Sequence, residues 1–86
     1  MNDWIIIKNR LVKEFIFKDF MESVEFINQV AEKAELLNHH PTLINTYNKV
    51  KVELWTHTVD EITELDYLLK DEIEKINSSL SNRKNK

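Results

Sequence analysis

The apolar residues of this chain switch between strand-like and helical spacing, and this alternation limits the fold more than any other feature of the sequence. Residues 4–17 are rich in β-branched and aromatic side chains, with a polar break at Lys8-Asn9-Arg10. Such a pattern is typical of two short strands joined by a turn, although this turn lacks the glycine that hairpin turns prefer. The segment therefore predicts a pair of strands at the start of the chain.

The spacing becomes helical after Phe17. Asp19 is the expected N-cap, because Glu22 follows three residues later in the capping-box position. The helix is expected to end at about Leu37, since Asn38 suits a helix C-terminus and Pro41 prevents continuation. One apolar stripe is predicted along this helix: Phe20, Val24, Ile27, Ala31 and Ala34.

The second half of the chain repeats this order. Residues 42–47 predict a strand with Asn48 near a turn, and the next segment alternates between apolar and polar side chains. Residues 63–66 match a capping box that opens a second helix. One face of the alternating strand carries Val50, Val52, Leu54 and Thr56, and the other carries Lys51, Glu53, Trp55 and His57. The second helix is expected to carry Leu65, Leu69, Ile73 and Ile76 on one face.

These elements follow one another as strand, strand, helix, strand, strand, helix. Strand pairs joined by short turns imply antiparallel pairing, and amphipathic helices need a sheet face to cover. The sequence thus predicts an α+β fold, a four-stranded antiparallel sheet with both helices packed on one face. Residues 1–76 would form the single domain, and the polar residues 77–86 are expected to be a frayed C-terminal tail.

Composition excludes several classes of function. The 86 residues include no glycine and no cysteine, which removes glycine-rich phosphate loops, disulfides, thiol catalysis and thiolate metal sites. The formal net charge of −3 argues against nucleic acid or an anionic membrane as the main partner. The apolar run at residues 4–7 is too short to span a bilayer. A cytoplasmic protein is expected.

The three histidines of the chain lie within nineteen residues, at His39, His40 and His57. Histidine is the side chain whose unperturbed pKa lies nearest neutrality, so it commonly moves protons at physiological pH. Three interpretations are open from the residues alone: surface and helix-capping histidines, a three-histidine zinc site, and metal-free acid/base catalysis. Trp55 lies on the same strand face as His57, where it could stack on a flat ligand or be buried in an interface.

Residues from Glu35 onward resemble the pterin-4a-carbinolamine dehydratase family. The family pattern has an acidic residue four before His-His-Pro, an aromatic residue six after the proline, Thr-His ending the last strand, and an aspartate opening the last helix. In this chain the pattern corresponds to Glu35, His39-His40-Pro41, Tyr47, Thr56-His57 and Asp66. Residues 15–20 and 30–35 also resemble the family, so the similarity covers roughly residues 4–76.

The resemblance implies a dimerisation-cofactor-like fold and assembly into homodimers or homotetramers. It implies dehydration of 4a-hydroxytetrahydrobiopterin, the pterin-4a-carbinolamine, to quinonoid dihydropterin, which supports tetrahydropterin recycling without a metal or cofactor. The family's catalytic histidines correspond to His39, His40 and His57. Around the substrate we expect Glu35, Asn38, Trp55 and Thr56.

Within that assignment we favour His39 and His57 on either side of the departing hydroxyl, with His40 orienting the pterin. Glu35 is expected to position a histidine rather than to react. Two features depart from the family. Its members usually carry an additional N-terminal helix before the first strand, and they usually have glycine in the loop that is Thr58–Glu61 here.

Two other functions fit the same resemblance. One is a non-catalytic protein-interaction module on the same fold, since one family member also stabilises dimers of a transcription factor. The other is a role with a related pterin in molybdenum-cofactor metabolism. The sequence carries no motif that distinguishes pterin side chains.

Overall fold

The computed structural model describes residues 3–84, and the side chains of residues 3–82. Its elements follow the order that the sequence predicts, β-β-α-β-β-α. They are β1 (Ile5–Ile7), β2 (Arg10–Ile16), α1 (Phe20–Leu37), β3 (Thr42–Thr46), β4 (Lys49–Leu54) and α2 (Glu64–Lys84). Within these residues, no helix is both long enough and apolar enough to cross a membrane.

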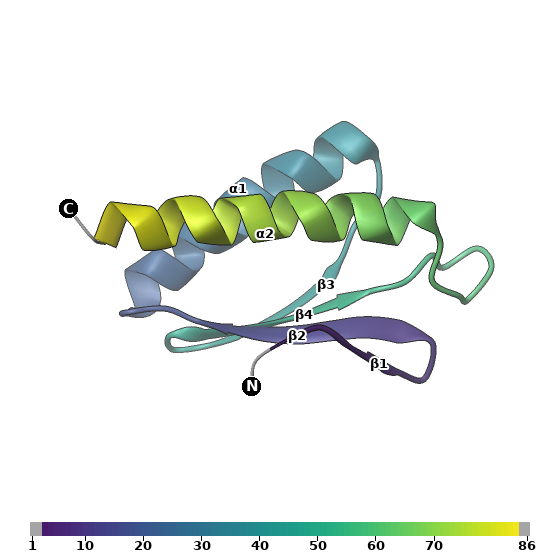
Figure 1. The fold of residues 1–86 in the computed structure, drawn as a ribbon, viewed down its shortest axis with the longest axis horizontal. Coiled ribbons are helices and arrows are strands. Elements are labelled where there is room, and N and C mark those ends of the chain that lie inside the picture. Colours follow the sequence, from purple (N-terminus) through teal and green to yellow (C-terminus); the bar gives the residue numbers. More distant parts are fainter. Residues whose placement is uncertain (1–2, 85–86) are drawn as a thin grey trace.

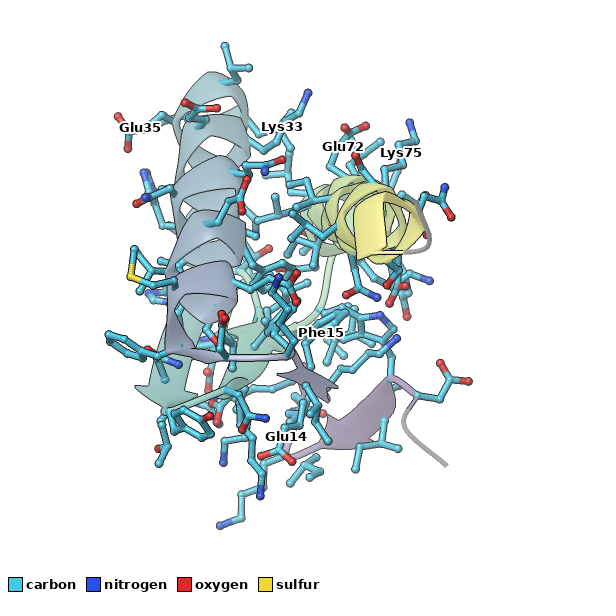
Figure 2. The ribbon with its side chains drawn as sticks, turned by 90° about the vertical axis from the view of Figure 1, so that its left-hand side faces the viewer. Glu14, Phe15, Lys33, Glu35, Glu72 and Lys75 are labelled. Carbon is cyan, nitrogen blue, oxygen red and sulfur yellow. The ribbon has the colours of Figure 1, made fainter. Side chains whose placement is uncertain are left out.

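The four strands form one antiparallel sheet in the order β1-β2-β4-β3, and both helices cover the same face of it (Figure 1). The central pair, β2 and β4, places Leu11 opposite Leu54 and Phe15 opposite Val50. In Figure 2, Phe15 points toward the helices whereas its neighbour Glu14 points away from them. The predicted α+β fold is therefore confirmed, and the alternation along the strands separates a covered face from an open one.

The turn between β1 and β2 forms without glycine. Lys8 and Asn9 both have positive φ angles, 49° and 64°. Positive φ at two successive residues is the geometry of the mirror-image turn whose twist matches that of the flanking strands. Asparagine tolerates this conformation better than most residues. Lys8 and Asn9 therefore form the predicted turn between β1 and β2 without glycine.

Both ends of α1 lie where the sequence predicts them. The side chain of Asp19 accepts a hydrogen bond from the Glu22 amide at 2.9 Å, and the Glu22 carboxylate accepts one from the Lys18 amide at 3.1 Å. Asn38 ends the helix in the left-handed conformation, with φ 51°. The chain therefore turns sharply out of α1 immediately before His39 and His40.

The predicted apolar stripe of α1 is wrong in its rotation about the helix axis. Phe20 and Ala31 are exposed, and the buried residues of the inward face are Glu22, Ser23, Phe26, Val30 and Ala34. Aromatic packing decides this rotation. The Phe26 ring lies 5.0 Å from the ring of Phe15 and 4.8 Å from that of Phe17, measured between centroids. Both partners come from the β2 side of the sheet, so spacing within the helix could not reveal them.

The expectation of a frayed tail is wrong for residues 77–84, because α2 continues to Lys84. Leu80 is only 2% exposed and extends the stripe of Leu69, Ile73 and Ile76 by one more helical turn. Burial of this leucine stabilises a segment whose composition is otherwise polar. Asn85 and Lys86, the end of the expected tail, lie outside the described residues.

Ion pairs and hydrogen bonds also fix α2 against its neighbours. Lys33 of α1 pairs with Glu72 of α2 at 3.5 Å, and both side chains lie along the top of the helix pair in Figure 2. Glu74 accepts hydrogen bonds from the Trp4 indole at 2.6 Å and from the Lys13 ammonium at 2.7 Å. These contacts fix α2 to α1 on one side and to Trp4 and Lys13 on the other. The first turn of α2 contributes to the site described next.

Candidate active site

Three segments meet at one end of the molecule. They are the C-terminal end of α1, the loop after β4 and the first turn of α2, all toward the right in Figure 1. The pocket between them has a volume of about 300 Å³. It is lined by Asn38, His39, His40, Thr56, His57, Thr58 and Leu65. This volume is at the lower end of the range for small-molecule sites, so the pocket suits one small ligand.

Chemistry rather than size selects this pocket. A larger hollow of about 480 Å³ lies against the first turns of α1, lined by residues between Lys18 and Asn28. None of the predicted site residues contributes to that hollow. The smaller pocket, in contrast, brings His39, His40 and His57 together.

His39 is held by a buried carboxylate. Its Nε2 atom lies 2.6 Å from Oδ1 of Asp66, and the two residues are 8% and 0% exposed. The other carboxylate oxygen of Asp66 accepts hydrogen bonds from the Thr63 amide at 2.8 Å and from the Thr56 hydroxyl at 2.9 Å. A buried carboxylate is tolerated when both of its oxygens accept hydrogen bonds in this way.

The proton positions in this network follow from its chemistry. Thr56 gives its single hydroxyl proton to Asp66, so the Thr63 hydroxyl, 2.6 Å away, must donate to Thr56. An ionised carboxylate only accepts, which places a proton on Nε2 of His39. With one proton on the ring, the lone pair lies on Nδ1, for which no hydrogen-bond partner is found among the described residues. The network fixes both the orientation and the tautomer of this histidine.

Asp66 was predicted to open α2 as a capping residue and was not among the predicted site residues. Its carboxylate does accept the hydrogen bond from the Thr63 amide, as a capping box requires. The same carboxylate also contacts His39, which lies 27 residues earlier in the chain. The family pattern contains this aspartate, and that was the signal in the sequence for a role beyond capping.

His40 has a carboxylate partner as well, but at the surface. Its Nε2 atom lies 2.6 Å from Oε2 of Glu35, and the two side chains are 55% and 77% exposed. Glu35 is outside the pocket lining and reaches the site only through this histidine. Solvent screens such a pair, so it orients the His40 ring much less firmly than Asp66 orients His39.

His57 contacts an aromatic ring instead of a carboxylate. Its imidazole stacks on the indole of Trp55, with 4.4 Å between ring centroids and 22° between planes. Trp55 is half-buried, lies outside the pocket lining, and has the Arg10 guanidinium 4.0 Å from its ring centroid. Neither Trp55 nor Glu35 lines the pocket, and each contacts a histidine that does.

The loop after His57 closes without glycine. The Thr56 amide donates to the Glu61 carbonyl oxygen at 2.8 Å, and these two residues form an isolated β-bridge. Asp60 takes the left-handed conformation, with φ 53°, at a position where glycine would meet no steric cost. The departure from the family pattern is accommodated by this one residue.

Metal-ligand geometry was one of the interpretations left open by the three histidines. Across residues 3–84, no three or more histidine, aspartate or glutamate side chains come together in a group that could hold a metal ion. Nε2 of His39 and Nε2 of His40 each face a carboxylate oxygen instead.

The fold and the pocket define a class of small α+β proteins in which histidines from a helix end and a strand end line one ligand-sized pocket. The family model for pterin 4 alpha carbinolamine dehydratase matches residues 1–76, and the chain belongs to this family. The resemblance seen in the sequence is thereby confirmed.

Curated relatives agree with this assignment. A protein of Saccharolobus solfataricus is 44% identical over 84 residues, which cover 92% of this chain and 87% of the relative. A protein of Sulfolobus acidocaldarius is 44% identical over 73 residues, covering 85% of this chain and 80% of the relative. Both carry the provisional name pterin-4-alpha-carbinolamine dehydratase.

Two solved structures are similar in fold. The transcriptional coactivator/pterin dehydratase of Brucella melitensis matches with a TM-score of 0.84 and 37% identity, over 86% of this chain and 81% of that one. A pterin dehydratase-like protein described as a RuBisCO assembly factor of the α-carboxysome matches with a TM-score of 0.72 over 88% of each chain. At 17% identity, this second likeness concerns the fold alone.

Proposed function

We propose that this protein dehydrates a 4a-hydroxytetrahydropterin to the quinonoid dihydropterin, with tetrahydrobiopterin carbinolamine as the expected substrate. One observation carries the proposal. A histidine whose tautomer is fixed by a buried carboxylate, His39, opens into the same pocket as two further histidines. Family membership supplies the substrate class.

The reaction needs two proton transfers. The bond between C4a and the hydroxyl oxygen breaks with its electron pair going to oxygen, and a proton delivered there lets it leave as water. The N5–H bond gives up its proton, and its electron pair forms the C4a=N5 double bond. General acid and general base catalysis typically contribute about 10²- to 10⁴-fold each. Imidazoles near neutral pH can perform both steps.

The environments of the histidines suggest which one does what. His39 accepts the N5 proton through Nδ1, because Asp66 on its other nitrogen stabilises the imidazolium that forms. His57, exposed beside Thr58 at the pocket edge, delivers the proton to the departing hydroxyl. His40, oriented by Glu35, holds the pterin ring.

The remaining predicted residues act around these three. Asn38 lines the pocket and offers both a donor and an acceptor to the pterin amide. Thr56 also lines the pocket, but its hydroxyl proton goes to Asp66, so it supports His39. Assembly into homodimers or homotetramers, which rests on the family resemblance, and a cytoplasmic location, which rests on the composition, complete the proposal.

A stopped-flow assay of 4a-hydroxytetrahydropterin dehydration tests the assignment. His57→Ala should lower the catalysed rate by roughly 10²-fold, the smaller end of what one acid or base contributes. Lys75→Gln, an exposed substitution on α2, is the control and should keep the wild-type rate. Near-normal turnover of the His57 variant would remove the proposed role.

A protein-binding function on the same fold is the second candidate. It is favoured by the similar structure from Brucella melitensis, which is described as a transcriptional coactivator/pterin dehydratase. Exposed leucines on the helices, Leu36 at 78% and Leu68 at 53%, give this chain apolar surface at a separate hollow of about 210 Å³ between α1 and α2. No acceleration of dehydration by the wild type, together with a stable complex with a partner protein, would favour this function over catalysis.

A further inference from the structure

His57 differs from the other two histidines in what holds it. It lies three residues beyond the end of β4, and its side chain is exposed. Within residues 3–84 its ring makes no hydrogen bond or ion pair, whereas His39 and His40 each have a carboxylate at 2.6 Å. A proton-transferring group must nevertheless be held in place, because small misplacements cost large factors in rate.

The indole of Trp55 is the group that contacts the His57 ring. A centroid separation of 4.4 Å and an interplanar angle of 22° describe a stacked pair. Trp55 directly follows the end of β4, and His57, two residues later, is the first residue of the turn that follows. The stack therefore joins the end of the strand to the start of the loop.

Arg10 in turn holds the indole. The β2–β4 register pairs Leu11 with Leu54, so its continuation places Arg10 opposite Trp55. The guanidinium carbon lies 4.0 Å from the indole centroid, within the distance of a cation–π contact. Because Arg10 begins β2, the contact connects the indole to the central strands of the sheet.

We infer that Trp55 is the positioning residue of His57 and that Arg10 keeps Trp55 in place. The series Arg10, Trp55, His57 transmits the rigidity of the sheet to an exposed imidazole. Trp55 lies outside the pocket lining and its ring is already engaged by His57 and Arg10, so it acts on the reaction through His57 instead of touching the pterin. The catalytic consequence rests on the proposed function, whereas the stack itself does not.

Proton NMR of the histidine rings tests the stack without any substrate. A ring stacked on an indole has its carbon-bound protons shifted upfield by the ring current, so the His57 signals should lie upfield. Trp55→Leu should move them back toward the values of a free histidine, and Trp55→Phe should retain part of the shift. The chain's other tryptophan provides the matched control, because Trp4→Phe should leave the His57 signals unchanged.

The signals of His39 and His40 report whether each variant is folded. If they keep their wild-type positions in Trp55→Leu and the His57 signals do not move either, the stack is absent and the inference is overturned. If Arg10→Gln leaves the His57 and Trp55 signals where they are in the wild type, the part of the inference that concerns Arg10 is overturned.

Kinetics then test the positioning role. Trp55→Leu should lower kcat about tenfold with KM within about twofold of wild type, because the substrate still binds but the proton donor is poorly placed. Trp55→Phe should recover most of the loss. A raised KM with unchanged kcat would instead make Trp55 a substrate contact. If the wild type dehydrates no pterin, the proposed function fails, and the NMR result still decides whether Trp55 holds His57.

Discussion

His39 and His57 line the same pocket but are held by opposite means. His39 is buried and contacts a carboxylate that is itself fully buried, whereas His57 is exposed and stacks on an aromatic ring. A hydrogen-bond network in a low-dielectric interior is strong, and it is costly to leave incomplete. A stack at the surface contributes less and tolerates rearrangement.

The difference shows how one small pocket can contain two imidazoles with different tasks. Asp66 fixes the orientation and the tautomer of His39, as suits a proton acceptor. Trp55 provides a flat surface and no acceptor, so it orients His57 without specifying which nitrogen carries a proton. Substitutions around His39 should therefore lower both the stability of the fold and the rate of dehydration, whereas substitutions around His57 should mainly lower the rate.

Removal of Asp66 should have the largest effect. Asp66→Ala leaves three hydrogen-bonding groups of Thr56, Thr63 and His39 without their acceptor, and we expect a loss of about 3–5 kcal/mol in the free energy of unfolding. Urea denaturation measures it. Asp66→Asn keeps the shape and should fold better, but dehydration should fall by about 10²- to 10⁴-fold, because the amide cannot hold His39 in the same tautomer. A wild-type rate in Asp66→Asn would mean that His39 needs no fixed tautomer.

Thr56→Val should have an intermediate effect. Valine has nearly the shape of threonine but removes the hydroxyl between Thr63 and Asp66, which should destabilise the fold by about 1–3 kcal/mol. Thr58→Val is the matched control, because Thr58 lines the same pocket but is exposed, and its cost should stay within about 0.5 kcal/mol. Equal melting temperatures for the two variants would contradict the importance of the buried network.

Glu35→Gln should have the smallest effect. The pair with His40 is exposed on both sides, so the loss of stability should not exceed about 1 kcal/mol, measured by thermal unfolding. Because glutamine can still accept a hydrogen bond from His40, we expect a modest rise in KM and little change in kcat. A loss of stability comparable to that of Asp66→Ala would contradict the view that the exposed Glu35–His40 pair stabilises the fold less than the buried Asp66–His39 pair.

The prediction of the fold from the sequence was most accurate where the signal is local. The limits of α1 follow from Asp19, Asn38 and Pro41, whose effects act within a few residues. The order of the strands and helices follows from the spacing of apolar residues in the same way. The prediction of which face of α1 is buried was wrong, because that face depends on the contacts of Phe26 with Phe15 and Phe17 across the core. The helical end of α2 was missed because a polar composition outweighed a single leucine, Leu80.

The same distinction between local signals and contacts in space applies to the candidate site. The sequence by itself determined the three histidines, the carboxylates at suitable spacing and the family to which the chain belongs, because these are matters of residue type and order. Only the tertiary structure decided that Asp66 holds His39 and that Trp55 holds His57. Those contacts depend on where a helix end, a strand end and a helix start meet in space, and on which groups are withdrawn from water there. Spacing along the chain carries no record of the contact between His39 and Asp66, which are 27 residues apart, whereas it places Trp55 near His57 without fixing the stack.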